Sequence, residues 1–181
     1  PDGNVEDLWD HREFCLNRDN ATAEIQIRLI KTALTNAFLE LTHLGLKVLK
    51  ESGQGTEIAE IQTIVSAPWS YTITKNITYT DEHPFTISEE LITELVQSAK
   101  NQSKLAFSTN KLAATLGLAI TDGDVINVSI NGYSVKEPIG QEAKVVTLSY
   151  LETAISKGIT DTLNDTVNKF FPKAKQTRYS F

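Results

Sequence analysis

The chain has no methionine and a single cysteine, Cys15, among its 181 residues. One cysteine excludes a disulfide within the chain, which agrees with a reducing compartment without requiring one. Because methionine is absent even at position 1, we expect a piece of a longer product or a processed one. No apolar run approaches the roughly 18 residues of a transmembrane helix, and no signal peptide is visible. We therefore predict a cytoplasmic location without membrane insertion, in which only partners would hold the chain at the inner face of the membrane.

Basic residues are also in the minority. The chain has 17 Lys and Arg against 23 Asp and Glu, and its formal net charge is -6. Because nucleic-acid binding needs a basic footprint, this balance argues against a nucleic-acid partner. The hydrophobic fraction of 40% is enough for a core. The length predicts one domain or two small ones.

Motifs of catalysis are missing as well, since the chain has no GxxxxGK(S/T), no GxSxG and no CxxC. Gly53-Gln54-Gly55-Thr56 has the glycines of a phosphate loop, but such a loop leads from a strand into a helix, and here the predicted order is reversed. The densest group of metal-ligand types is Asp10, His11, Glu13 and Cys15. In an irregular acidic arm, solvated side chains are the commoner interpretation. We therefore predict no catalytic, cofactor-binding or metal-binding residues, and no enzyme activity for the isolated chain.

A helical pattern dominates the first third of the chain. Apolar residues recur every three or four positions, at Ile30, Leu34, Ala37, Leu41, Leu44 and Val48. This stripe predicts one long helix from about 21 to 51, with Asn20 as its N-cap and the glycines after Ser52 at its end. A coiled coil is the competing interpretation. The limited length and the glycine at position 45 favour packing against a sheet.

Three further helices are predicted downstream. Ser88 is a good N-cap for a helix over 88–100, with Glu89 and Glu90 near the positive end of the helix dipole. A short helix is expected over 111–118. A last amphipathic helix is indicated by the apolar positions Ile155, Ile159, Leu163, Val167 and Phe170, and it should end at Pro172.

Strands are predicted where apolar residues form short runs or alternate with polar ones. The ranges are 61–65, 71–79, 125–131, 144–150 and 174–181. Pro84 is expected to stop the second strand, and Thr121-Asp122-Gly123-Asp124 is expected to form a turn. Trp69, which follows Pro68, is expected to anchor a corner by packing. The resulting order predicts an α+β fold, a mixed β-sheet with amphipathic helices packed on it.

Three stretches resemble actin-superfamily scaffold proteins of the FtsA and PilM type. They are VSAPWSYTITKNI, HPFTISEELITEL and VINVSINGYSVKEPIGQEAKVVTLSYLETAI. In that family a proline-aromatic corner leads into a strand, and an Asn-Gly-Tyr hairpin follows a helix that starts after Pro-Phe. The resemblance covers about residues 58 to 181. It implies part of the first lobe of an actin-like protein, including an insert of strand-helix-strand-strand order.

The chain also departs from that family. The Asp-x-Gly phosphate loop, the second lobe and the C-terminal membrane helix are not found. The resemblance therefore implies that a longer parent protein could bind ATP while this chain holds no cofactor. We divide the sequence into an acidic N-terminal arm (1–19), a long helix with the first strand (20–70), an insert-like subdomain (71–151) and a C-terminal helix and strand (152–181).

The predicted interaction site is the loop from Gly132 to Gln141. Tyr133, Val135 and Ile139 are apolar residues in an otherwise polar loop, and a tyrosine with aliphatic neighbours is a typical interface anchor. The alternative is that all three fold back on their own domain. We expect a non-catalytic scaffold for bacterial cell division or pilus assembly, with protein partners that include further copies of the chain. A structural protein of a virion or surface appendage is the alternative, and a small-molecule enzyme is the third hypothesis.

Overall fold

The structure, a computed structural model, describes residues 7–15, 21–53 and 55–180. The chain forms two compact units, one built from the residues up to Thr63 together with Gly158–Tyr179, the other built mainly from Ile64–Lys157. Both units combine helices with strands, so the α+β class predicted from the sequence is confirmed. The insert-like segment 71–151 lies within the second unit.

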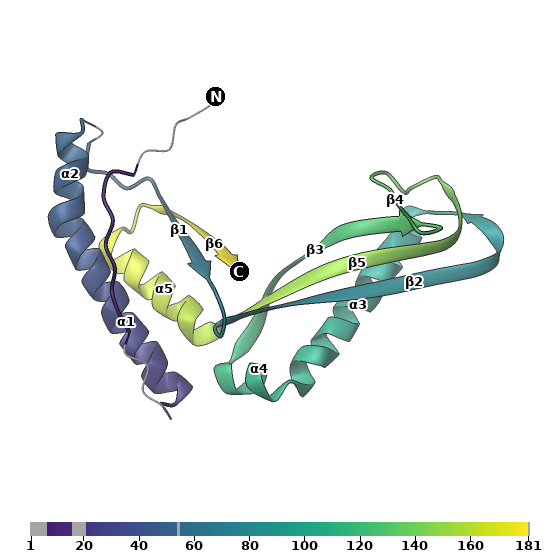
Figure 1. Cartoon of the computed structure of the whole chain (residues 1–181), viewed down its shortest axis with the longest axis horizontal. Helices are drawn as coiled ribbons and strands as arrows, with labels where there is room; N and C mark the ends of the chain where they lie inside the picture. Colours follow the sequence, from purple (N-terminus) through teal and green to yellow (C-terminus); the bar gives the residue numbers. More distant parts are fainter. Residues whose placement is uncertain (1–6, 16–20, 54, 181) are drawn as a thin grey trace. The chain divides into compact units, whose positions relative to one another are not determined.

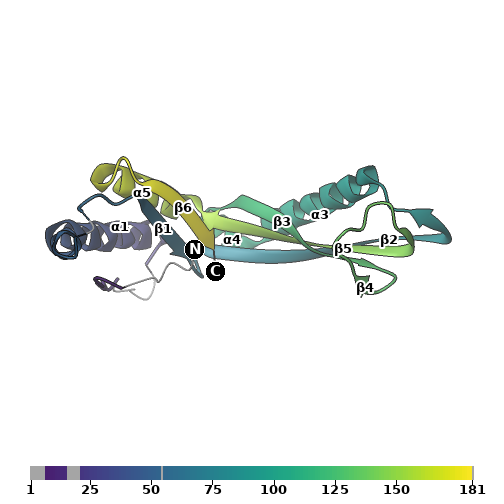
Figure 2. The ribbon, with the colours of Figure 1, turned by 90° about the horizontal axis from the view of Figure 1, so that it is seen from above.

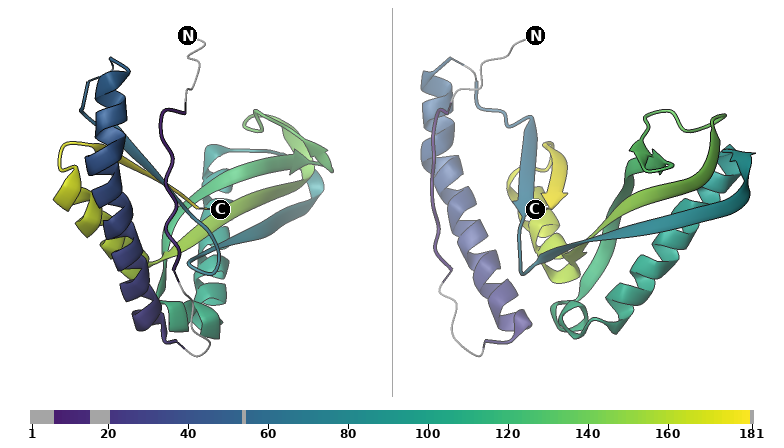
Figure 3. Two further views of the ribbon diagram at one scale, coloured as in Figure 1. Left: turned by 60° about the vertical axis from the view of Figure 1, so that its left-hand side comes forward. Right: turned by 45° about the vertical axis from the view of Figure 1, so that its right-hand side comes forward.

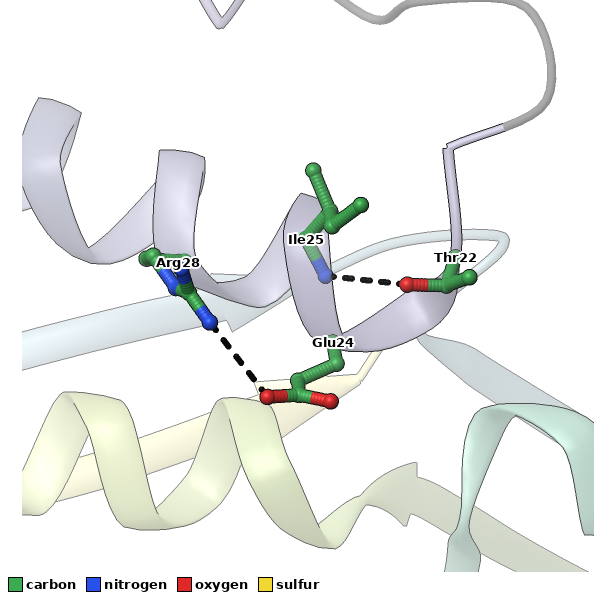
Figure 4. A network of polar contacts seen from close by, with 4 residues as sticks. All are labelled: Thr22, Glu24, Ile25 and Arg28. Carbon is green, nitrogen blue, oxygen red and sulfur yellow. Dashed lines mark hydrogen bonds and ion pairs between the residues drawn. The ribbon is translucent and has the colours of Figure 1, made fainter.

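The first unit begins with one continuous helical stretch. It comprises α1 (Ala23–Glu40), a π-helical turn η1 (Leu41–Gly45) and α2 (Leu46–Glu51), which agrees with the predicted long helix. Thr22 is the N-cap, because its hydroxyl accepts a hydrogen bond from the Ile25 N–H at 3.4 Å (Figure 4). One turn on, Arg28 and Glu24 form an exposed ion pair at 3.3 Å (Figure 4). The predicted N-cap, Asn20, lies outside the described residues.

Gly45 has a packing role in this helical stretch. It is buried, and a Cβ built on it would lie 2.6 Å from Cδ1 of Leu41 and 3.1 Å from the ring of Trp9. The missing side chain therefore lets the N-terminal arm approach the helix closely. Phe14, on the same arm, is 85% exposed.

The rest of the first unit is α5 (Lys157–Phe170) and the strand pair β1 (Glu60–Val65) and β6 (Lys175–Ser180). Figures 1 and 3 show β1 and β6 side by side, pointing in the same direction. The α5 helix contacts α1 through Gly158, which leaves room for Ile27, and through an ion pair between Lys31 and Asp165 at 3.8 Å. Its buried apolar stripe is Ile159, Leu163 and Val167, as predicted.

The second unit is a four-stranded antiparallel sheet with helices on one side. Its order is β2 (Ser70–Thr86), β5 (Glu142–Ser156), β3 (Leu118–Ile130) and β4 (Tyr133–Ser134). Figure 2 shows α3 (Glu89–Thr109) on one side of this sheet. The short α4 (Lys111–Leu116) follows α3. The strands thus belong to two sheets, whereas the sequence predicted one mixed sheet.

The N-terminus of α3 is built as predicted. The Ser88 hydroxyl accepts the Leu91 N–H at 3.2 Å. Hydrogen bonds from the backbone N–H of Glu90 and from Ser88 hold the pKa of the Glu90 carboxyl below its usual value. The helix continues to Thr109, beyond the predicted end at residue 100, because the buried face repeats every four residues. That face consists of Leu95, Ala99, Ser103 and Phe107.

The core of the second unit lies between α3 and the sheet. Val146, Leu148 and Tyr150 of β5 are at most 3% exposed and pack with Ile77, Val128 and Leu95. These strand residues are cross-strand partners, since Leu148 faces Ile77 on one side and Val128 on the other. The opposite face of the sheet carries Thr72, Thr74, Asn76, Thr78 and Thr80 on β2, all exposed.

Two boundary predictions were wrong. Pro84 was expected to stop the second strand, but β2 continues to Thr86, and Pro84 lies where pairing with β5 is interrupted, between Thr80 and Phe85. Its missing N–H costs no ladder bond there. Ile155 was assigned to the last helix, but it lies in β5 opposite Ser70, and α5 begins at Lys157. Trp69, at the corner before β2, is half-buried.

The predicted turn at Thr121–Asp124 is also wrong, because these residues lie in β3 and pair with β5. Gly123 faces Glu152, and a Cβ built on it would overlap the Tyr150 hydroxyl and lie 2.8 Å from Cζ of Tyr150. A glycine inside a strand thus marks a close approach, here by an aromatic ring across the strand pair. Burial, followed by the nearby carboxylate of Glu152, raises the pKa of the Tyr150 hydroxyl.

We expect Gly123→Ala to lower the free energy of unfolding by about 1–3 kcal/mol, because the added methyl group overpacks the contact with Tyr150. In a Tyr150→Leu background the same change should cost much less, since the hydroxyl and outer ring atoms are gone. Urea denaturation of the four members of this double-mutant cycle measures the coupling. Equal effects of Gly123→Ala in both backgrounds would contradict the contact.

Candidate interaction surface

The predicted loop opens with a tight turn at Asn131 and Gly132. Both have positive φ angles, 50° and 89°, which is the backbone of a type I′ hairpin turn and suits the Asn-Gly dipeptide. The Asn131 N–H donates to the Val145 carbonyl at 2.8 Å. Its side-chain Oδ1 accepts the N–H groups of Lys144 and Val145 at 3.1 and 3.0 Å. Asn131 therefore fixes the turn to the central strand β5.

The residues after this turn fold back on β3. Ser129 pairs with Ser134 and Ile130 with Tyr133, which makes β4 a short edge strand. The Ser134 hydroxyl donates to Oδ1 of Asn127 at 2.5 Å. The Val135 N–H then donates to the Val128 carbonyl at 2.8 Å. The first half of the loop is thus held by backbone and side-chain hydrogen bonds together.

The second half is held at the start of α3. The Gly140 N–H donates to the Ile87 carbonyl at 2.8 Å, and the Ile87 N–H donates to the Gln141 carbonyl at 2.9 Å. Ile87 itself is fully buried. The Gln141 side-chain amide donates to the Glu137 carbonyl at 2.7 Å and closes the last turn of the loop. Both ends of the loop are therefore tied to the core of the second unit.

The three predicted contact residues lie in two environments. Tyr133 is 79% exposed and Ile139 is 54% exposed. Val135 is half-buried and packs against the core cluster of the second unit, so it holds the loop instead of extending from it. The surface that we call the hairpin surface therefore consists of Tyr133 and Ile139.

The residues that brace the hairpin surface were not predicted from the sequence. Asn131 and Gln141 make the decisive side-chain hydrogen bonds, and Ile87 supplies backbone groups from a distant segment. The Asn-Gly dipeptide before Tyr133 was the available signal for the first of these, because it is the strongest short-range sign of a tight hairpin. The pairing with Ile87 has no local sequence signal.

The other candidate groups do not form a site. In the N-terminal arm, Nε2 of His11 lies 2.9 Å from Oε1 of Glu13, and the His11 ring stacks on Trp9. Within residues 7–15, 21–53 and 55–180, no three His, Cys, Asp or Glu side chains are grouped as a metal site would require. Glu152 is 3% exposed, and its Oε2 has no hydrogen-bond partner. This buried carboxylate lies near the Tyr150 hydroxyl, and that pair alone defines no reaction.

No family model matches the chain, and no curated protein is found to be similar to it. None of the helices in the part of the chain that the structure describes combines the length and apolar character required to cross a membrane.

We expect Asn131→Ala to lower the free energy of unfolding by about 1–3 kcal/mol, because it removes two hydrogen bonds and places alanine at a positive φ angle. Asn131→Gly keeps the backbone conformation and loses only the side-chain bonds, so it should cost less. Thermal or urea denaturation of both variants separates the two contributions. Wild-type stability of Asn131→Ala would show that the turn does not brace the loop.

Proposed function

We propose that this chain is a non-catalytic protein-interaction scaffold that binds its partner through the hairpin surface. The observation that carries the proposal is the contrast within one loop. Tyr133 is 79% exposed, while the backbone on either side of it is tied to β3, β5 and the start of α3. A large side chain that stays in water on a braced backbone is the arrangement expected of a binding residue on a rigid support.

The chemistry of the hairpin surface suits a protein partner. Tyrosine is enriched among the residues that dominate binding energy, because its ring buries a large area and its hydroxyl forms a hydrogen bond. A braced loop loses little conformational entropy when it binds, so more of the contact energy appears as affinity. Ile139, in the second half of the same loop, adds an exposed aliphatic side chain.

The cellular role that we propose is bacterial cell division or pilus assembly. Support comes from the resemblance to FtsA-like and PilM-like scaffolds and from the order β2, α3, β3, β5 in the second unit, which is the strand-helix-strand-strand order of the insert in that family. On this proposal the chain is cytoplasmic, reaches the membrane only through partners and binds no nucleic acid. A longer parent protein could bind ATP, which this chain would not.

A structural protein of a virion or surface appendage is the second candidate function. The observation that favours it is the threonine-rich face of the sheet opposite α3. On that face Oγ1 of Thr78 and Oγ1 of Thr147 are hydrogen-bonded at 2.9 Å, and exposed threonines continue along β2. A threonine-rich polar face of this kind suits the repeated side-by-side packing of identical subunits.

The test is the double variant Tyr133→Ser and Ile139→Ser. We expect its free energy of unfolding to stay within about 0.5 kcal/mol of wild type, because truncating exposed side chains leaves no cavity. Binding should weaken at least about tenfold if the pair includes a dominant contact. Thermal melting reports stability, and binding is measured by quantitative pull-down of partner proteins from the native lysate.

Two variants in the same loop serve as controls. Val135→Ser should lower the melting temperature, because Val135 packs on the core. Lys136→Ser, at an exposed position beside it, should change neither stability nor binding. Unchanged melting together with unchanged capture of partner proteins by the double variant would remove the hairpin surface as the interface. A large loss of melting temperature would assign Tyr133 and Ile139 to the core.

A further inference from the structure

The strand β2 forms one edge of the four-stranded sheet and is unusually long. It pairs with β5 on one side, and among the described residues no strand pairs with its other side. From Ser70 to Thr80 its register with β5 is uninterrupted. Tyr133 of the hairpin surface lies in β4 at the opposite edge, beyond β3 (Figure 1). The outer edge of β2 is therefore a second surface, separate from the one in the proposed function.

The direction of the backbone groups along β2 follows from the start of its pairing with β5. Ser156 donates its N–H to the carbonyl of Trp69 at 2.8 Å, so these two opposite residues form a hydrogen-bonded pair. In an antiparallel ladder such pairs alternate with non-bonded pairs. The N–H and C=O groups of Ile73, Lys75, Ile77 and Tyr79 therefore point toward β5. Those of Thr72, Thr74, Asn76, Thr78 and Thr80 point toward the open edge.

Apart from Lys75, the devices that usually protect an edge strand lie at the two ends of this stretch. Pro68 precedes it, and the interruption containing Pro84 follows it. Between them, SYTITKNITYT has no proline or glycine and a single charged residue, Lys75. Natural proteins seldom leave such a regular, nearly uncharged edge open, because it is a template for another strand.

The sequence of this edge is complementary to itself. In an antiparallel pair, residues directly opposite each other point to the same face. The backbone N–H and C=O groups that point outward belong to every second residue, the threonines and Asn76. When two copies pair, these residues of one copy lie opposite those of the other copy on the exposed face. On the helix-covered face it sets Ile77 against Ile77 and Lys75 of one copy beside Tyr79 of the other. Centring the pair on Ile77 therefore keeps the two lysines apart and gives each an aromatic ring.

We propose that two copies of this chain pair through the outer edge of β2, antiparallel about a two-fold axis at Ile77, so that their sheets join into one. The occupant of this edge is a second copy of the chain. Its affinity comes from main-chain hydrogen bonds and its register from the side-chain pairs.

Hydrogen exchange measured by NMR at increasing protein concentration tests this directly. The amides of Ile73, Lys75 and Ile77 are bonded to β5 and should be protected at every concentration. The amides of Thr74, Asn76 and Thr78 should exchange quickly in dilute samples and become protected as the dimer forms, in step with the mass measured by sedimentation. A chain that stays monomeric, with these three amides exposed at the highest concentration, would overturn the proposal.

Two variants at Asn76 identify the surface. Asn76→Pro removes an outward N–H and no bond to β5, so it should weaken dimerisation on the order of ten- to hundredfold. Asn76→Lys places a charge on the edge and should also weaken dimerisation. This variant tests the proposal if the proline variant fails to fold. Ser149→Lys is the matched control, because Ser149 lies opposite Asn76 on the central strand. Equal dimerisation of the Asn76 variants and the wild type would exclude β2 as the interface. Loss of dimerisation in Ser149→Lys, to the same degree as in the Asn76 variants, would also exclude β2 as the interface.

These outcomes are independent of the proposed function. Tyr133→Ser with Ile139→Ser should leave the β2 dimer intact, and the Asn76 variants should still bind a partner through the hairpin surface.

Discussion

The packing of the central strand β5 against α3 is the interaction on which the second unit depends. Val146, Leu148 and Tyr150 are nearly inaccessible to solvent, and β5 pairs with β2 on one side and with β3 on the other. Burying three such side chains contributes roughly 1.5–3 kcal/mol each relative to leaving them exposed. Because the turn at Asn131 is hydrogen-bonded to β5, the position of the hairpin surface follows from the same packing.

The sequence predicted those parts of the fold that local chemistry determines. The cap at Ser88 is local because a hydroxyl and a nearby N–H satisfy each other within one turn. The long first helix and the buried stripe of α5 follow from residues three and four positions apart. The exposure of Tyr133 and Ile139 also agrees with the prediction of a loop whose apolar residues are available.

The wrong predictions concern residues whose local structure depends on a segment that is distant in the sequence. The sequence around Gly123 is typical of a turn. In the structure the glycine lies in a strand and makes room for the Tyr150 ring of the neighbouring strand. Pro84 looks like a strand terminator, but it lies at an interrupted part of an edge strand, where no N–H is needed. Val135 could not be separated from its two apolar neighbours, because only the fold of the loop turns it toward the core.

The central claim is that the hairpin surface is rigid before any partner binds. Backbone ¹⁵N relaxation of the free chain tests it most directly, by comparing residues 132–141 with the strands β3 and β5. The account predicts order parameters near about 0.85 for Tyr133 and its neighbours, as in regular strands. Values below about 0.6 across the loop would mean that its hydrogen bonds to β5 and Ile87 do not hold it, and would contradict the account.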